Sequence, residues 1–201
     1  MTQKKKISQH FKEKDPIIHR LHLVITFNEV IPSTHYFEDL CDSIISQQLS
    51  VKASATIFKR FKEIMPKQEI TPEQVLSLPS EQLRQVGISF AKISYIKDLA
   101  EKVLHEEIHL NKLAEMSDQE VIEELTKVKG IGVWTAEMFL MFSLGREDIF
   151  SCGDLGLQKA VQKQYGLKEK ITKEQLLKLS AQWAPYRTYA ARFLWKSLEL
   201  P

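Results

Sequence analysis

LTKVKGIGVWTA, residues 125–136, is the stretch of sequence that decides the fold. An acidic, amphipathic segment ends near Leu125, a Gly-x-Gly turn follows at residues 130–132, and an apolar segment begins at Val133. The two glycines allow a positive φ and a close approach by a partner, and Ile131 between them is expected to anchor the turn in the core. The first amides of the second helix are unpaired and carry the positive end of its dipole, which favours a bound phosphate. By itself the pattern is equally typical of a tight turn that only joins two helices.

Apolar residues recur at helical spacing through most of the chain. Ser117 and Glu120 have the spacing of a capping box, and Thr71 followed by Pro72 is typical of a helix start. Residues 18–24 are rich in β-branched side chains, but their alternation is too short to predict a strand. The pattern therefore predicts an all-α globule. Its clearest helical segments are residues 37–49, 51–65, 89–105, 117–125, 133–144 and about 186–198, with short helices from Leu155 and Lys173.

The composition allows one domain with a substantial core. The chain has 201 residues, and 43% of them are hydrophobic. We expect the domain to span residues 10–201, after a basic, disordered tail at residues 1–9. Lys and Arg (28) outnumber Asp and Glu (26) by only 2, so a nucleic-acid partner would require the positive charge to be gathered on one face.

The two cysteines, Cys41 and Cys152, are too few for a four-cysteine zinc or iron–sulfur site. Nothing predicts a disulfide framework, and we expect both to be packing residues. No segment resembles a signal peptide or a membrane span. We therefore expect a protein of the cytoplasm and nucleoid, or of the nucleus, that is not secreted.

Val128 to Ala136 closely resembles the helix-hairpin-helix motif of the base-excision DNA glycosylase superfamily, Leu-x-Gly-φ-Gly-x-x-Thr-Ala, where φ is apolar. Val128 stands in the first position, and Lys129 replaces the proline that is common there. The resemblance implies a fold of two helical lobes with the active-site cleft between them. One is a middle lobe of about residues 37–148 that contains the hairpin at 125–136. The other is formed by about residues 10–36 and 149–201.

The resemblance also implies a catalytic aspartate about twenty residues beyond the hairpin. Asp154 lies 22 residues after Gly132 (154 − 132), in a loop at residues 148–157. Breaking a nucleoside C1′–N bond passes through an oxocarbenium-like state, which an ionised carboxylate stabilises while it orients or deprotonates water. Taken alone, Asp154 is better explained as the N-cap of the next helix, because Asp is common at helix starts. The two roles are compatible, because the dipole of that helix keeps a carboxylate ionised.

Bifunctional members of the superfamily carry a nucleophilic lysine two residues after the second glycine, where this chain has Trp134. Without an amine there, no Schiff base can form, and no strand-cleaving lyase activity is expected. Residues 44–53, 85–96 and 183–195 resemble segments of the 3-methyladenine DNA glycosylase II (AlkA-like) branch, in a compact form without the extra N-terminal β-domain. That branch implies a monomer that flips alkylated purines out of double-stranded DNA and hydrolyses the N-glycosidic bond, leaving an abasic site.

The resemblance assigns further roles by position. A flipped, cationic base would stack on aromatic side chains of a pocket, and an apolar or polar side chain would fill the gap in the duplex. Arg187 is expected to form a buried ion pair that fixes the last helix. The expected base pocket consists of Trp134, Trp195, Tyr189 and Met138, where some relatives have a tyrosine. The expected DNA contacts are the wedge residues Gln48 and Leu49, the phosphate-binding Lys52, Lys92 and Lys129, and Gly130, Ile131, Gly132 and Thr135 of the hairpin. No cofactor is required, although a Na⁺ or K⁺ ion on the main-chain carbonyls of Thr126, Val128 and Ile131 is consistent with the family.

Four other interpretations stay open at this stage. The chain could be a helix-hairpin-helix DNA-binding module without catalysis, or a glycosylase for other damaged bases. It could also be a lyase-competent glycosylase that uses a different lysine, or an all-α interaction domain unrelated to DNA.

Overall fold

The computed structural model describes residues 2–26 and 29–200, and within these ranges every regular element is helical. The prediction of an all-α fold is thus confirmed. No helix in the described ranges is both long and apolar enough to cross a membrane. Cys41 and Cys152 are buried and are not joined in a disulfide.

The chain forms two compact units, which we call the hairpin unit (residues 32–144) and the terminal unit (residues 1–31 with 145–201). The divisions after Ile31 and Leu144 differ by a few residues from the expected ones after residues 36 and 148. The helices of the hairpin unit are α3 (Tyr36–Ser46), α4 (Val51–Glu63), η1 (Pro66–Gln68), α5 (Pro72–Ser77), α6 (Ser80–Gln85), α7 (Phe90–Leu104), η2 (Leu110–Lys112), α8 (Asp118–Thr126) and α9 (Val133–Phe142). The helices of the terminal unit are α1 (Gln3–Lys14), α2 (Pro16–Val24), α10 (Leu155–Gln164), α11 (Lys173–Ala181) and α12 (Arg187–Ser197).

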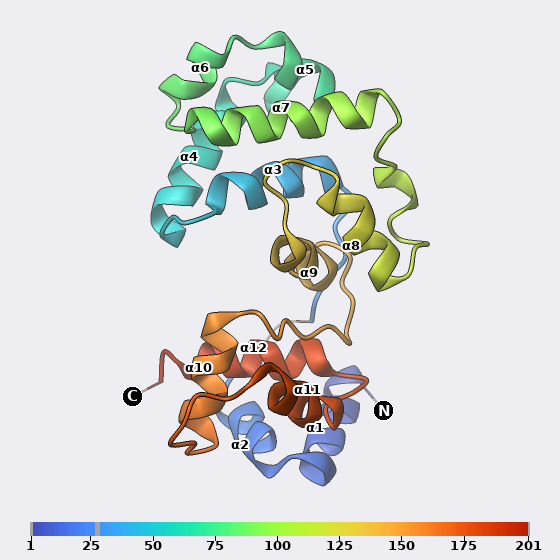
Figure 1. Cartoon of the computed structure of the whole chain (residues 1–201), viewed down its shortest axis with the longest axis vertical. Helices are drawn as coiled ribbons and strands as arrows, with labels where there is room; N and C mark the ends of the chain where they lie inside the picture. The colour runs from blue at the N-terminus through green and yellow to red at the C-terminus, as the bar shows by residue number, and fades with distance from the viewer. Residues whose placement is uncertain (1, 27–28, 201) are drawn as a thin grey trace. The chain divides into compact units, whose positions relative to one another are not determined.

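Helix α3 is the centre of the hairpin unit, where it contacts α4, α7 and α9 (Figure 1). Its apolar residues recur at helical spacing, and Leu40, Cys41, Ile44 and Ile45 are all fully buried. Helix α7 packs on α5 and α6 as well as on α3, and α8 packs on α9. Burying so much of α3 holds its C-terminal end, and the turn that follows, in a defined place.

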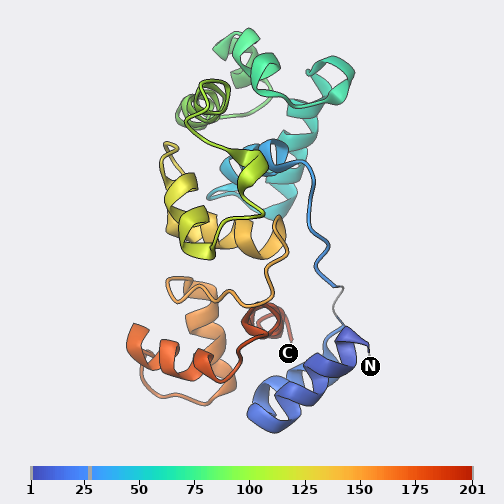
Figure 2. The same ribbon diagram turned by 90° about the vertical axis from the view of Figure 1, so that its right-hand side faces the viewer.

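The terminal unit joins the two ends of the chain around α12, which packs on both α2 and α10 (Figure 2). Asp15 is 3% exposed, and its Oδ1 accepts hydrogen bonds from the first amides of α2 at 3.0 and 3.1 Å. Its Oδ2 accepts from the indole of Trp183 at 2.7 Å, from Gln182 at 3.1 Å, and from the hydroxyl of Tyr165. One buried carboxylate therefore links the N-terminal helices to the C-terminal part of the unit.

The expected disordered tail at residues 1–9 is wrong for its described part. Gln3–Lys14 is helical, and Ile7 and Phe11 are fully buried. The two apolar side chains are four residues apart and share one face, so tertiary packing orders a helix whose remaining surface is polar. Met1, the first residue of that tail, lies outside the described residues.

Candidate functional site

The hairpin between α8 and α9 depends on its two glycines for different reasons. Gly130 has φ +80°, and a Cβ atom on it would lie 2.1 Å from Cδ2 of Tyr95, so a larger residue does not fit. Gly132 has φ −99° and ψ 175°, which is extended backbone, and nothing lies within 4 Å of where its Cβ would be. Of the two features that the glycines allow, Gly130 therefore uses the positive φ and Gly132 does not. Its missing side chain instead leaves open space in front of the N-terminus of α9.

Helix α7 contacts the hairpin through a buried carboxylate that sequence analysis missed. Asp98 is 6% exposed, and its Oδ2 accepts a hydrogen bond from the backbone N–H of Lys129 at 2.9 Å. Its Oδ1 accepts from Nζ of Lys102 at 2.9 Å and lies 3.4 Å from Nζ of Lys129. Burial disfavours the charge, but the N–H and ammonium groups outweigh it and lower the pKa of Asp98. An acidic residue between the apolar helix positions Ile96 and Leu99 was the signal that could have revealed it.

The turn between α3 and α4 is bonded to the same hairpin. Gln47 donates from Nε2 to the carbonyl oxygen of Gly130 at 2.8 Å. Lys92 donates from Nζ to the carbonyls of Ile45 and Gln47, at 2.8 and 2.6 Å. The expected role of Lys92 as a phosphate contact is corrected here, because its ammonium instead satisfies carbonyls at the C-terminal end of α3. Burial lowers its pKa.

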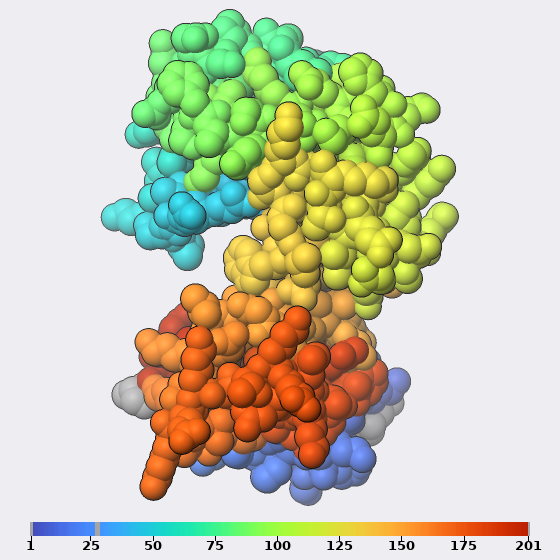
Figure 3. Space-filling model, viewed as in Figure 1, coloured from blue at the N-terminus to red at the C-terminus, as the bar shows by residue number. Residues whose placement is uncertain are grey.

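A cavity of about 590 Å³ opens between α3, this turn and α9. Figure 3 shows the light-blue residues of α3 and α4 projecting at the surface of the hairpin unit. Of the predicted site residues, this cavity brings together Gln48, Leu49, Gly130, Trp134, Thr135 and Met138. Sequence analysis missed four other residues that line it, which are Asp42, Ser43, Ser46 and Gln47. The first three are polar residues of an amphipathic helix, a pattern that is also typical of a solvent-exposed face, so only the fold reveals that this side of α3 faces a cavity.

The exposure of the lining residues fits contact with a large ligand. Trp134 and Leu49 are 47% and 40% exposed, and Gln48 has a positive φ of 58° at the tip of the turn. Thr135 is only 5% exposed, and Ile131 is 4% exposed and anchors the turn as expected. A partner can therefore reach the hairpin at Ile131 only through its main chain.

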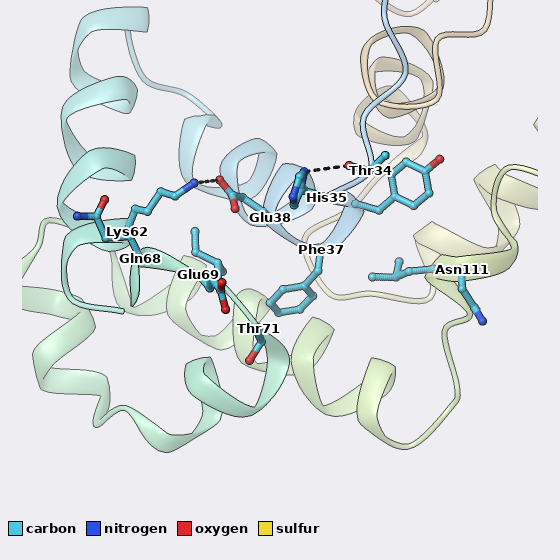
Figure 4. Close-up of a pocket in the computed structure, with 12 residues that line it drawn as sticks. Thr34, His35, Phe37, Glu38, Lys62, Gln68, Glu69, Thr71 and Asn111 are labelled. Atoms are coloured by element: carbon cyan, nitrogen blue, oxygen red, sulfur yellow. Dashed lines mark hydrogen bonds and ion pairs between the residues drawn. The ribbon is translucent and has the colours of Figure 1, made fainter. Parts of the chain in front are cut away.

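A second cavity in the hairpin unit, of about 600 Å³, surrounds the start of α3 (Figure 4). Glu38 and Lys62 form an ion pair on its wall, with 2.6 Å between Oε1 and Nζ, and Phe37 also lines it. None of the predicted site residues, all of which the structure describes, takes part in this wall. The first cavity is therefore the candidate site in this unit.

Asp154 and Trp195 meet in the terminal unit. Asp154 is 8% exposed, and its Oδ1 accepts hydrogen bonds from the backbone N–H of Leu157 at 2.7 Å and from the indole Nε1 of Trp195 at 2.9 Å. The carboxylate is thus the N-cap of α10, as its position suggested. A Cβ on Gly156 would lie 3.0 Å from that oxygen and 3.3 Å from the indole, so the glycine makes room for the pair.

Tyr189 does not join this pair, contrary to the expectation that it lines the base pocket. It is 2% exposed, and its hydroxyl donates to Oε1 of Glu147 at 2.7 Å. Gln3 of α1 donates to the same carboxylate at 2.8 Å. Tyr189 precedes Trp195 by six positions on α12, which turns it about 240° around the helix axis. Burial and the hydrogen bond to Glu147 raise the pKa of Tyr189. Its side chain is therefore part of the core of the terminal unit.

Arg187 forms the expected ion pair, although it is half-buried rather than buried. Its Nε and Nη2 donate to the two carboxylate oxygens of Asp148 at 2.7 and 2.9 Å. This two-pronged contact fixes the start of α12. The other expected phosphate contacts, Lys52 and Lys129, are exposed, and the side chain of Lys129 keeps 72% of its surface open.

Comparison with known proteins gives consistent matches. The model of the family described as "HhH-GPD superfamily base excision DNA repair protein" matches residues 41–185. DNA-3-methyladenine glycosylase 1 of Schizosaccharomyces pombe is 40% identical over 166 residues, which is 82% of this chain and 73% of that protein. A putative DNA-3-methyladenine glycosylase of Bacillus subtilis is 34% identical over 78% of this chain, which spans 56% of that relative.

Two solved structures are similar along nearly the whole chain. The crystal structure of a Bacillus halodurans DNA-3-methyladenine glycosidase has a TM-score of 0.84 and 36% identity, covering 99% of this chain and 90% of that one. A Schizosaccharomyces pombe 3-methyladenine DNA glycosylase in complex with abasic DNA has a TM-score of 0.86 and 36% identity, covering 97% of both chains.

Proposed function

This chain belongs to the HhH-GPD superfamily of base excision DNA repair proteins, and from that premise we propose that it is a monofunctional DNA-3-methyladenine glycosylase. It flips alkylated purines out of double-stranded DNA and hydrolyses the N-glycosidic bond, leaving an abasic site. The relatives named above support the substrate class, and the one solved with abasic DNA supports the duplex as partner. We place its action with the DNA of the cell, as a monomer.

The observation that carries the proposal is the pair formed by Asp154 and Trp195. A carboxylate that accepts two N–H bonds and caps a helix is held in place while it faces a developing positive charge. As the C1′–N bond breaks, that charge appears on the sugar, and Asp154 stabilises it and orients the attacking water. An alkylated purine is already cationic and leaves as a neutral base, so no second carboxylate is needed as an acid.

Trp134 decides between hydrolysis and lyase chemistry in this proposal. It occupies the position of the nucleophilic lysine of bifunctional relatives, and its indole cannot form a Schiff base. It lines the cavity of the hairpin unit together with Met138, where its exposed ring is available to stack on a flipped base.

The hairpin supplies the DNA contacts. Amides at the start of α9 face the open space left by Gly132 and suit a phosphate. Lys52 and Lys129 are exposed cations that can neutralise neighbouring phosphates, and Gln48 and Leu49 at the α3–α4 tip are the proposed wedge.

The hairpin carbonyls also fit the monovalent cation that the family allows. The carbonyl of Val128 accepts one hydrogen bond, from the N–H of Ile131 at 3.1 Å, and a carbonyl oxygen has a second lone pair. With Thr126 and Ile131 it would hold Na⁺ or K⁺, which would neutralise carbonyl dipoles near the phosphate site. The described residues contain no cluster of His, Cys, Asp and Glu suited to a metal. We propose that no cofactor takes part in the reaction.

A screen of base release across duplexes carrying single defined lesions tests the proposed function. We expect release of 3-methyladenine or 7-methylguanine, detected by chromatography, with the strand left intact. Duplex binding without any release would favour a non-catalytic module. A covalent adduct after borohydride treatment would instead reveal a lyase with another lysine.

A further inference from the structure

We propose that Asp42 is a specificity-determining residue, whose carboxylate favours positively charged alkylated bases over neutral damaged bases. The proposal rests on the proposed function and concerns the cavity of the hairpin unit. It assigns a role to a residue on the cavity-lining side of α3 that the motifs of the family do not include.

The geometry places Asp42 at the ligand-facing side of α3. Asp42 and Ser46 are one helical turn apart, and the hydroxyl of Ser46 donates to Oδ1 of Asp42 at 3.3 Å. Both line the cavity, as do Trp134 and Met138 of α9. A base that stacks on the exposed indole of Trp134 would therefore share the cavity with this carboxylate.

Asp42 is the one charged side chain among the lining residues, and all of these are described. It is half-buried, and none of the ion pairs formed by the described residues includes it. Two lysines that bond to α3 or to its C-cap are engaged with other groups: Lys62 pairs with Glu38, and Lys92 binds the carbonyls of Ile45 and Gln47. The cavity thus presents a negative charge without a protein counter-ion.

The surroundings of Asp42 favour a positive partner. Burial raises its pKa, the hydrogen bond from Ser46 opposes the shift, and the neighbouring Asp39 and Glu38 raise the pKa further. A carboxylate in such a place gains from any cation that enters the cavity. A neutral base provides no such gain and leaves the desolvation of the carboxylate uncompensated.

Purines alkylated at N3 or N7 carry a formal positive charge in DNA, whereas hypoxanthine and 1,N6-ethenoadenine are neutral. In the transition state the charge is shared between the departing base and the sugar, so Asp42 still interacts with part of it. The effect therefore belongs in kcat/KM, which compares the free reactants with the transition state. Interaction with a nearby unit charge across a half-buried site corresponds to a discrimination of about tenfold.

The experiment compares kcat/KM for a 7-methylguanine duplex and a hypoxanthine duplex in wild type and Asp42→Asn. We expect the ratio of the two values to fall about tenfold in the variant, while its affinity for an abasic duplex, which has no base, stays within about twofold. Asp42→Ser is a second neutral variant, used if Asn lowers the yield of folded protein. Glu63→Gln is the matched control, because it removes one negative charge from the hairpin unit outside the cavity and should leave the ratio unchanged.

The outcomes separate this proposal from the one it rests on. If the wild type releases neither base, the proposed function fails and the role of Asp42 fails with it. If the wild type is active and the ratio is unchanged in both neutral variants, or both lesions lose activity equally, the role of Asp42 alone is overturned.

Discussion

The N-termini of α9 and α10 differ in what balances the positive end of the helix dipole. The N-cap of helix α9 is Gly132, which has no side chain to accept hydrogen bonds from the first amides and has open space before it. The N-cap of helix α10 is Asp154, whose own carboxylate accepts a hydrogen bond from the N–H of Leu157. The positive end of the α9 dipole is open to an external anion, whereas that of α10 holds a carboxylate of the protein, which we propose to be catalytic. A helix start can therefore serve binding or chemistry, depending on one residue.

The largest expected effect on activity comes from removing the charge of Asp154 at the N-terminus of α10. Asp154→Asn should lower single-turnover base release from a methylated duplex by at least about 10²–10³-fold, because the developing sugar cation loses its counter-charge. Asparagine is still a good N-cap, so the free energy of unfolding should change by well under about 1 kcal/mol. Abasic-duplex binding should survive. Full activity in this variant would remove Asp154 from the mechanism.

The two hairpin glycines provide a matched pair of substitutions. Gly130→Ala forces a Cβ against the ring of Tyr95 at a positive φ, and should lower the free energy of unfolding by about 2 kcal/mol or more. Gly132→Ala should cost no more than about 1 kcal/mol, but it places a methyl group in front of α9 and should weaken duplex binding about tenfold. Denaturant unfolding and binding titrations measure both. Equal effects of the two changes on stability would contradict the different roles of these glycines.

Substitution of Asp98 tests how much the hairpin before α9 depends on its contact with α7. Its pKa is lowered in the folded protein, so its contribution to stability is present above the unfolded value of about 4 and is lost as the pH falls through the folded value. Asp98→Asn should therefore lower the free energy of unfolding by about 1–3 kcal/mol at pH 7. The difference from wild type should shrink below about pH 4. A constant difference over pH 3–7 would show that the charge of Asp98 is irrelevant.

The smallest effects are expected from the lysines around the same hairpin. Lys52→Ala and Lys129→Ala should each weaken duplex binding a few-fold and reduce the slope of log affinity against log salt by about 1, as expected for one lost phosphate contact. Lys92→Met should leave that slope unchanged and lower stability instead, since its ammonium holds the end of α3. A salt slope that falls in Lys92→Met would return this residue to the interface.

Local features were predictable because short-range chemistry encodes them. Three such features depend on residues a few positions apart: the capping box at Ser117, the Gly-x-Gly turn, and Asp154 as the N-cap of α10. The errors arose where partners are distant in the chain. Lys92 and Lys52 were both predicted as phosphate contacts. The fold brings Lys92, however, to carbonyls 45 and 47 residues away in the chain.

By itself the sequence determined the all-α class, the hairpin and its Gly-x-Gly turn, the absence of a lysine at Trp134, and the candidacy of Asp154. Each depends on periodicity or on spacing within one or two helical turns. The tertiary structure alone decided that Asp98 supports the hairpin, that Tyr189 belongs to a core, that residues 3–14 form a helix, and that Asp42 faces a cavity. These depend on which buried group meets which partner, and that choice is made by the packing of the whole unit rather than by neighbours in the chain.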